Sequence, residues 1–253
     1  MKFILGIFLL ALTSSAFAED INITADNKVE FHQKSQKIVA TGNAFASKGK
    51  MSIKSDTLTG YYKEKSNNSK GQIKRIVAHG NVIMHSPKAD ASGNQLDYDI
   101  EQDKAVLTGT PSLIKTDKET ISAQNNITYY PSEQKAIAIG NVEATDQQNN
   151  KIFSDKMIAY FEKDPNNKDG ITLNKVEIFG NIKIITPDAE VSAEKGTYSP
   201  KKGLIKLFNN VIINQQGNIL KGDKAETNLN TGISKLIAKD GKSRVKGVFK
   251  EKK

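Results

Sequence analysis

The stretch that decides the fold is VAHGNV at residues 77–82, a short apolar run interrupted by a Gly-Asn pair. Five similar stretches occur elsewhere, two of them with one of the two central residues replaced. Along the chain the six copies are residues 39–44 (VATGNA), 77–82 (VAHGNV), 106–111 (VLTGTP), 137–142 (IAIGNV), 177–182 (EIFGNI) and 206–211 (KLFNNV). A pattern that returns every few tens of residues indicates a repeat architecture.

The spacing of the copies predicts a duplication. The central positions are separated by 38, 29, 31, 40 and 29 residues, so the series begins again after three copies. Other landmarks return at nearly the same offset: Ser55-Asp56 matches Ser154-Asp155, and Ser86-Pro87 matches Thr186-Pro187. We therefore expect a tandem duplication of a unit of about 100 residues, itself built from three smaller units.

Turn-forming residues precede each copy, as in residues 67–71 and 165–170, and a second strand-like run precedes each turn, as in residues 58–62 and 157–161. No long segment has a helical period. The sequence thus predicts an all-β fold of repeated strand-turn-strand units, with roughly a dozen to sixteen short antiparallel strands.

One face of every predicted strand is apolar. Successive side chains of a strand point to opposite faces, and the positions two and four residues before and after each central residue are apolar in all six copies. In the third copy these positions include Pro111 and Leu113. The candidate apolar groove is formed by Ile76, Ala78, Val82, Met84, Leu107, Leu113, Ala138, Val142, Ile178, Ile182, Ile184, Leu207 and Val211.

Two interpretations of this face compete. It could be the dry core of a structural β-repeat protein, filled by its own side chains. It could also be an open groove that shields the acyl chains of a lipid from water. Eight of its twenty-four positions are Ala and the chain has no Trp, so large side chains that would fill a core are scarce.

The N-terminus has the features of a signal peptide. Lys2 precedes a ten-residue apolar run at residues 3–12, and Ala16-Phe17-Ala18 supplies a small-x-small cleavage pattern. We expect cleavage between Ala18 and Glu19 and export across the inner membrane to the periplasm. The alternative is an uncleaved N-terminal anchor. The predicted organisation is a signal peptide (1–18), a β domain (19–238) and a basic C-terminal tail (239–253).

Charge and composition exclude several kinds of protein. The net charge is +9, but residues 235–253 carry eight of the Lys and Arg residues against two acidic ones. A basic tail of this kind attracts phosphate-bearing lipid or is simply solvated. The strands have no basic-aromatic face of the kind that binds nucleic acid. Without cysteine, the chain has neither disulfides nor thiolate metal sites.

No catalytic or cofactor motif is present in the sequence. The three histidines, His32, His79 and His85, lack the spacing of a metal site. Gly241-Lys242-Ser243 lacks the upstream Gly of a phosphate-binding loop. We therefore expect no enzymatic activity, no metal and no cofactor.

The repeats resemble the OstA/LptA family of lipopolysaccharide-transport proteins. The resemblance rests on the recurring A-x-G-N-V strand, paired with strand openings at Asp26, Ser55-Asp56, Ser154-Asp155 and Gly222-Asp223. It covers nearly the whole mature chain, although the chain is longer than is typical of the family. The resemblance implies an antiparallel OstA-like β-jelly roll, open at both ends, that carries lipopolysaccharide along its apolar interior.

The resemblance also implies the partners. They are the acyl chains of lipid A, an inner-membrane LptC-like protein and an outer-membrane LptD-like protein, with head-to-tail homo-oligomers as a further assembly. An open sheet can accept such partners by strand addition at its ends. We expect the first strand at residues 21–31 and the last regular strand at 219–229 or 233–238. An LptC-like anchored relative is the alternative identity.

N-terminal sequencing of the native protein checks the signal peptide. Cleavage should leave Glu19 as the first residue, because the apolar run is short for a membrane span. A native protein that begins at Met1 would instead be the anchored relative.

Overall fold

Every regular element that the structure describes is a β-strand. The computed structural model describes residues 20–65, 69–164, 170–238 and 244–248, and within these ranges it has eighteen strands and no helix. No helix long and apolar enough to cross a membrane occurs in this part of the chain. The predicted signal peptide and most of the predicted basic tail lie outside the described residues. The all-β prediction is confirmed.

The strands fall into two compact units. Of the described residues, those within 20–117 and 123–136 form the N-terminal unit, and those within 118–122 and 137–248 form the C-terminal unit. The strands of the N-terminal unit are β1 (Asn22–Thr24), β2 (Lys28–His32), β3 (Lys37–Lys48), β4 (Met51–Lys65), β5 (Ser69–Ser86), β6 (Ala89–Asp99), β7 (Lys104–Thr108), β8 (Ser112–Thr116) and β10 (Asn126–Tyr130). Those that lie wholly or mainly in the C-terminal unit are β9 (Glu119–Ala123), β11 (Lys135–Asp146), β12 (Lys151–Lys163), β13 (Ile171–Ile185), β14 (Ala189–Ser199), β15 (Leu204–Gln215), β16 (Asn218–Asn228), β17 (Ile233–Ile237) and β18 (Lys246–Val248).

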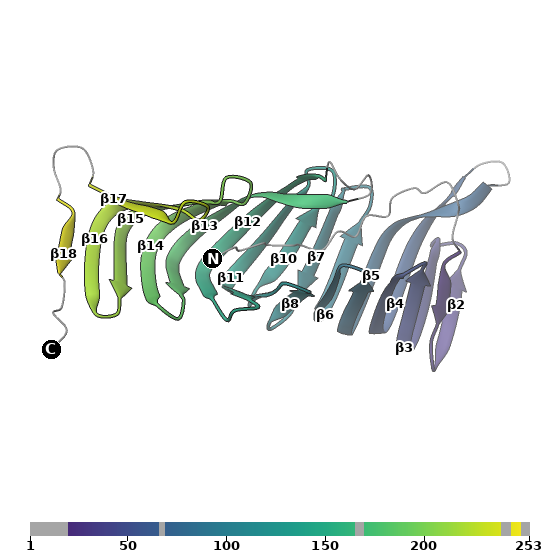
Figure 1. Ribbon diagram of the computed structural model, residues 1–253. Coiled ribbons are helices and arrows are strands. Elements are labelled where there is room, and N and C mark those ends of the chain that lie inside the picture. Colours follow the sequence, from purple (N-terminus) through teal and green to yellow (C-terminus); the bar gives the residue numbers. More distant parts are fainter. Residues whose placement is uncertain (1–19, 66–68, 165–169, 239–243, 249–253) are drawn as a thin grey trace. The chain divides into compact units, whose positions relative to one another are not determined.

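Within each unit, strands that follow one another along the chain pair antiparallel and lie side by side (Figure 1). In the N-terminal unit β2 to β6 pair in chain order, β1 also pairs with β3, β6 pairs with both β7 and β8, and β7 pairs with β10. In the C-terminal unit β12 to β16 pair in chain order, β11 pairs with β9, and β16 pairs with both β17 and β18. This connectivity is the antiparallel strand-turn-strand repeat that the sequence predicts.

The Gly-Asn pairs form a bulge within the long strands that contain them, and we call this bulge the corner. On β5 the ladder to β6 runs from His79 directly to Val82, so Gly80 and Asn81 together oppose a single residue. Both have positive φ angles, +76° and +48°. Such a bulge bends its strand and strengthens the local twist.

The weakest copy of the motif makes the same corner without glycine. Asn209 and Asn210 have φ angles of +62° and +51°, and the register of β15 shifts between Phe208 and Val211. Asparagine is among the few residues that adopt left-handed backbone at modest cost, because its side chain forms local hydrogen bonds. Residues 206–211 therefore form the same kind of bulge as the copies that contain Gly-Asn, as the sequence predicts.

An aspartate carboxylate holds three of the corners, from the neighbouring strand β4 or β12 in two cases and from the bend between β1 and β2 in the third. Asn81 Nδ2 donates to Asp56 Oδ1 and Oδ2 at 3.1 and 3.0 Å, and Asn181 Nδ2 donates to Asp155 Oδ1 and Oδ2 at 3.2 and 2.9 Å. Asn43 Nδ2 donates likewise to Asp26 Oδ2 at 2.7 Å. The Ser-Asp strand openings and the Gly-Asn pairs are thus two halves of one contact.

Glycine is required at the corner for two reasons. A Cβ at Gly180 would lie 2.1 Å from Asp155 Oδ2 and 2.8 Å from its Cγ, and φ is +74° there. A side chain at this position would therefore displace the carboxylate that accepts from Asn181, and it would also strain the backbone.

The third copy departs from the prediction. Three residues, Gly109, Thr110 and Pro111, separate β7 from β8, whereas the other corners leave two residues out of the ladder. Because the extra residue reverses the alternation of faces, Ser112 and Ile114 are buried, Pro111 is exposed and Leu113 is only half-buried. The buried Ser112 hydroxyl donates to the Leu107 carbonyl oxygen at 3.2 Å. The placement of Pro111 and Leu113 on the apolar face was wrong, because proline cannot donate to a strand ladder.

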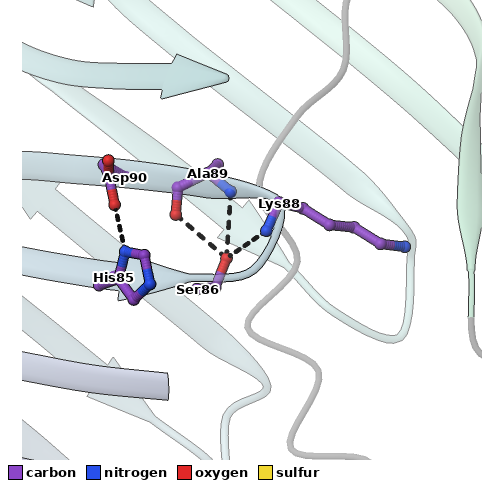
Figure 2. A network of polar contacts seen from close by, with 5 residues as sticks. All are labelled: His85, Ser86, Lys88, Ala89 and Asp90. Atoms are coloured by element: carbon purple, nitrogen blue, oxygen red, sulfur yellow. Dashed lines mark hydrogen bonds and ion pairs between the residues drawn. The ribbon is translucent and has the colours of Figure 1, made fainter. Parts of the chain in front are cut away.

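The turns between long strands are closed by local side-chain contacts. Figure 2 shows the turn between β5 and β6, where Ser86 Oγ donates to the Ala89 carbonyl oxygen at 3.1 Å and accepts from the Ala89 amide at 3.2 Å. His85 Nδ1 lies 2.6 Å from Asp90 Oδ1 on the paired strand. Thr186 makes the same two contacts with Ala189 in the turn between β13 and β14. The tandem duplication itself stays a prediction.

The first and last strands of the chain are each divided into two short pieces. In the N-terminal unit β1 and β2 pair with different parts of β3, where a single strand at residues 21–31 was expected. In the C-terminal unit β17 and β18 pair with different parts of β16. The strand β18 lies inside the segment that the sequence assigned to the basic tail.

Replacing Gly180 by Ala should lower the free energy of unfolding by about 2–4 kcal/mol, which combines the strained φ with loss of the Asp155–Asn181 hydrogen bond. Gly232 provides a matched control, since its φ is +70° and a Cβ there would have no atom within 4 Å. Gly232→Ala should cost only the backbone strain, about 1 kcal/mol. Urea unfolding of the two variants measures the difference, and equal losses would show that the carboxylate contact does not matter.

Candidate functional site

In the N-terminal unit the predicted apolar residues lie on one face and point inward. Ala78, Val82 and Met84 are 0%, 1% and 3% exposed, while Ile83, between the last two, is 52% exposed. Ala78 and Val82 lie on opposite sides of the corner and yet share a face. Because the bulge removes two residues from the ladder, the alternation continues across the bend.

The C-terminal unit repeats this arrangement with larger side chains. Ile178, Ile182 and Ile184 are buried on β13, and Val211 is buried on β15. Asn181, at the corner between them, is exposed. The buried members of the predicted set across both units are Ala78, Val82, Met84, Leu107, Ala138, Val142, Ile178, Ile182, Ile184, Leu207 and Val211, while Ile76 and Leu113 are half-buried.

The strands between the Gly-Asn copies add residues that the sequence analysis missed. Leu96 and Ile127 are both paired with Leu107. Tyr98 and Tyr129 are both paired with Ala105. In the C-terminal unit Met157, Ala159 and Phe161 of β12 are buried in the same alternating way. The available signal was their period of two along each intervening strand.

An apolar pocket lies in the interior of the C-terminal unit. Its lining comes from β12 to β15 and includes Met157, Ile178, Ile184, Tyr198 and Leu207. Its free volume is about 20 Å³, which is room for a single water-sized sphere. This pocket therefore has no room for a larger guest in this conformation.

Burial affects the tyrosines of this face. It raises the pKa of Tyr98, Tyr129 and Tyr198, with a smaller contribution from the Asp103 carboxylate at Tyr98 and Tyr129 and from Glu119 at Tyr198. These three hydroxyls stay protonated at neutral pH and can act as hydrogen-bond donors.

The opposite face carries alternating Lys and Phe side chains. Lys156, Phe179, Lys195, Phe208 and Lys224 are successive partners across β12 to β16. Lys195 Nζ lies 5.4 Å from the centre of the Phe179 ring, and Lys224 Nζ lies 5.6 Å from that of Phe208. These cation–π pairs shield the aromatic rings of an otherwise solvated face. The expectation that no strand face combines basic and aromatic side chains was wrong for β12 to β16, because this row forms only when the strands pair.

The histidines are at the surface. His79 and His85 are exposed, and His32 lies 4.0 Å from Glu30 with 42% of its side chain accessible. Within the described ranges, no group of three or more His, Cys, Asp or Glu residues is placed to hold a metal ion.

Together the bent antiparallel strands and the inward apolar face define a β-jelly roll with an apolar interior. The chain belongs to the family described as LptA/(LptD N-terminal domain) LPS transport protein, whose model matches residues 22–135 and again residues 120–233. Membership places it in a lipopolysaccharide-transport family.

Among solved structures, the chain is similar to the crystal structure of LptH, the LptA-homologous periplasmic component of the conserved lipopolysaccharide transport device from Pseudomonas aeruginosa. The identity is 11%, the match covers 92% of this chain and 96% of LptH, and the TM-score is 0.23. No curated protein matches the sequence.

Two neighbouring residues of β5 test which face is inside. Val82→Asp should lower the free energy of unfolding by about 4 kcal/mol or more, because it places an unpaired charge in the apolar interior. Ile83→Asp on the exposed face should cost about 1 kcal/mol or less. Chemical denaturation of both variants provides the comparison, and a similar cost for the two would contradict the assigned faces.

Proposed function

We propose that the protein is a periplasmic carrier that moves lipopolysaccharide from the inner to the outer membrane, with the acyl chains held against the apolar face. The main observation that supports this proposal is that apolar residues before and after the Gly-Asn corners are buried on one face within each unit. The chain also belongs to a lipopolysaccharide-transport family. We propose binding and transfer as its activity, without catalysis.

The free energy of hydration explains why a carrier of this lipid needs such a face. Each methylene exposed to water costs about 0.8 kcal/mol, so an acyl chain of a dozen carbons costs roughly 10 kcal/mol to hold in water. A long apolar face covers several such chains, whereas a few separate pockets do not.

Loading requires a change in the interior. The pocket at Ile178 and Leu207 has room for about one water-sized sphere. We propose that the two halves of the bent strands move apart as chains enter, so that chain–wall contacts replace wall–wall contacts. The alanines of the wall, such as Ala78 and Ala138, have few contacts to lose when this happens.

The end strands are proposed as the docking points. Backbone groups at the end of an open sheet can pair with a strand from another chain. The series begins with β1 and β2 on β3 and ends with β17 and β18 on β16. We propose that these ends meet LptC-like and LptD-like proteins, or further copies of this chain.

Lipid extraction tests the proposal directly. The mature protein, purified without detergent, should release lipid A into organic solvent, where mass spectrometry identifies it. The stripped protein should then bind added lipopolysaccharide. Failure of both experiments would favour a structural β-repeat protein with a dry core.

A matched pair on β11 links binding to the apolar face. Val142 is 0% exposed and Ile139 is 36% exposed on the opposite face. Val142→Thr should weaken lipopolysaccharide binding roughly fivefold or more, because a hydroxyl on the wall faces the acyl chain without a partner. Ile139→Thr should leave the affinity unchanged. Urea unfolding establishes that both variants fold, and wild-type affinity in a folded Val142→Thr protein would refute this site.

A further inference from the structure

The interior of the N-terminal unit contains a hydroxyl with no hydrogen-bond partner. Tyr129 is 7% exposed, and its hydroxyl oxygen is fully buried and unbonded. A buried hydroxyl without a partner costs about 1–3 kcal/mol. Such groups are rare in native structures, and each one calls for a specific explanation.

The strand register places this hydroxyl on the proposed lipid-binding face. Tyr129 is paired with Ala105, and Ile127 is paired with Leu107, a member of the apolar face. On the other side of Ala105, its partner on β6 is Tyr98. Two tyrosines therefore flank an alanine across three adjacent strands, and strands of a sheet lie about 4.8 Å apart. Ala105 has the smallest side chain of the three and is 6% exposed; we call its position in this row, between the two rings, the slot.

The slot is distant from the corner and near the ends of the strands. Ala105 is the second residue of β7, and both hydroxyls are close enough to the Asp103 carboxylate to feel its charge. Asp103 lies in the turn before β7, where its carboxylate accepts from the Ser132 amide at 2.7 Å. Tyrosine suits a boundary of this kind, because its ring is apolar and its hydroxyl is polar.

The corresponding row of the C-terminal unit has no such slot. There the cross-strand partners are Tyr198, Ile205 and Thr227, so a branched aliphatic side chain occupies the position that corresponds to Ala105. The tyrosine–alanine–tyrosine row is a feature of the N-terminal unit.

We infer that Tyr129 is a ligand-binding residue whose hydroxyl donates a hydrogen bond to an acyl carbonyl oxygen, the ester or amide oxygen where a fatty chain joins its head group. This inference rests on the proposed carrier function and specifies which part of the lipid lies at this level. A chain lying in the slot beside Ala105 brings its carbonyl to the strand ends, where Tyr129 is the donor that lacks a partner.

Two amphiphiles with the same tail separate this role from general apolar binding. Sucrose monolaurate has an acyl carbonyl, whereas dodecyl maltoside has a twelve-carbon tail and a disaccharide head but no carbonyl. The wild-type protein should bind sucrose monolaurate about three- to tenfold more tightly than dodecyl maltoside, the range expected for one neutral hydrogen bond. Tyr129→Phe should abolish this preference and leave the affinity for dodecyl maltoside unchanged.

Tyr130 is the matched control on the same strand. It is half-exposed and its ring lies 4.6 Å from Lys135 Nζ on the outside. Tyr130→Phe keeps the ring and should keep the preference for the ester. A preference retained by Tyr129→Phe, or lost equally in Tyr130→Phe, would overturn the inference.

Thermal unfolding of the lipid-free protein supplies an independent readout. Because the hydroxyl has no internal partner, Tyr129→Phe should raise Tm by about 2–4 °C. A lower Tm would mean that the hydroxyl serves the fold itself, and would overturn the inference. If the wild-type protein binds neither amphiphile, the carrier function fails and this inference fails with it, whereas equal binding of both amphiphiles by wild type removes only the role of Tyr129.

Discussion

The structure depends on the contact between a corner and a carboxylate on the adjacent strand. Two residues in left-handed conformation oppose one residue, and the asparagine amide of the pair donates to an aspartate such as Asp56 or Asp155. An isolated bulge of this kind would be a local irregularity of one strand. Repeated on alternate strands of each unit, it bends these strands while their ladders resume beyond the bulge.

The bulge also preserves the alternation of faces. Since two residues leave the ladder together, Val82 continues the inward face of Ala78, and Ile182 continues that of Ile178. The apolar face therefore runs through the bend and lies inside it on both sides. The third copy shows the consequence of a different count, because three residues leave the ladder there and Ile114 takes the place expected for Leu113.

The polar groups of the two faces differ in their purpose. On the outer face, Lys195 and Lys224 cover phenylalanine rings, and Arg75 forms a two-point contact with Asp97 that lowers the pKa of this carboxyl. These contacts keep an exposed sheet soluble and contribute little to stability individually. Buried polar groups of the described residues include serines such as Ser112, which are bonded to the backbone, the Glu119 carboxyl group and the tyrosine hydroxyls. The proposed ligand contact arises from this second group.

Much of the architecture followed from the sequence alone, because it depends on local chemistry. The Gly-Asn pairs determine where the strands bend, and period-two alternation determines which of their side chains are apolar, as at Val82, Val142 and Ile178. The tertiary structure decided what depends on pairing between strands: the reversed face after Pro111, the division of the end strands into β1 with β2 and β17 with β18, the carboxylate that each asparagine meets, and the unpartnered hydroxyl of Tyr129. Register and neighbours are set by contacts between residues distant in sequence, and a local pattern carries no information about which strand lies opposite.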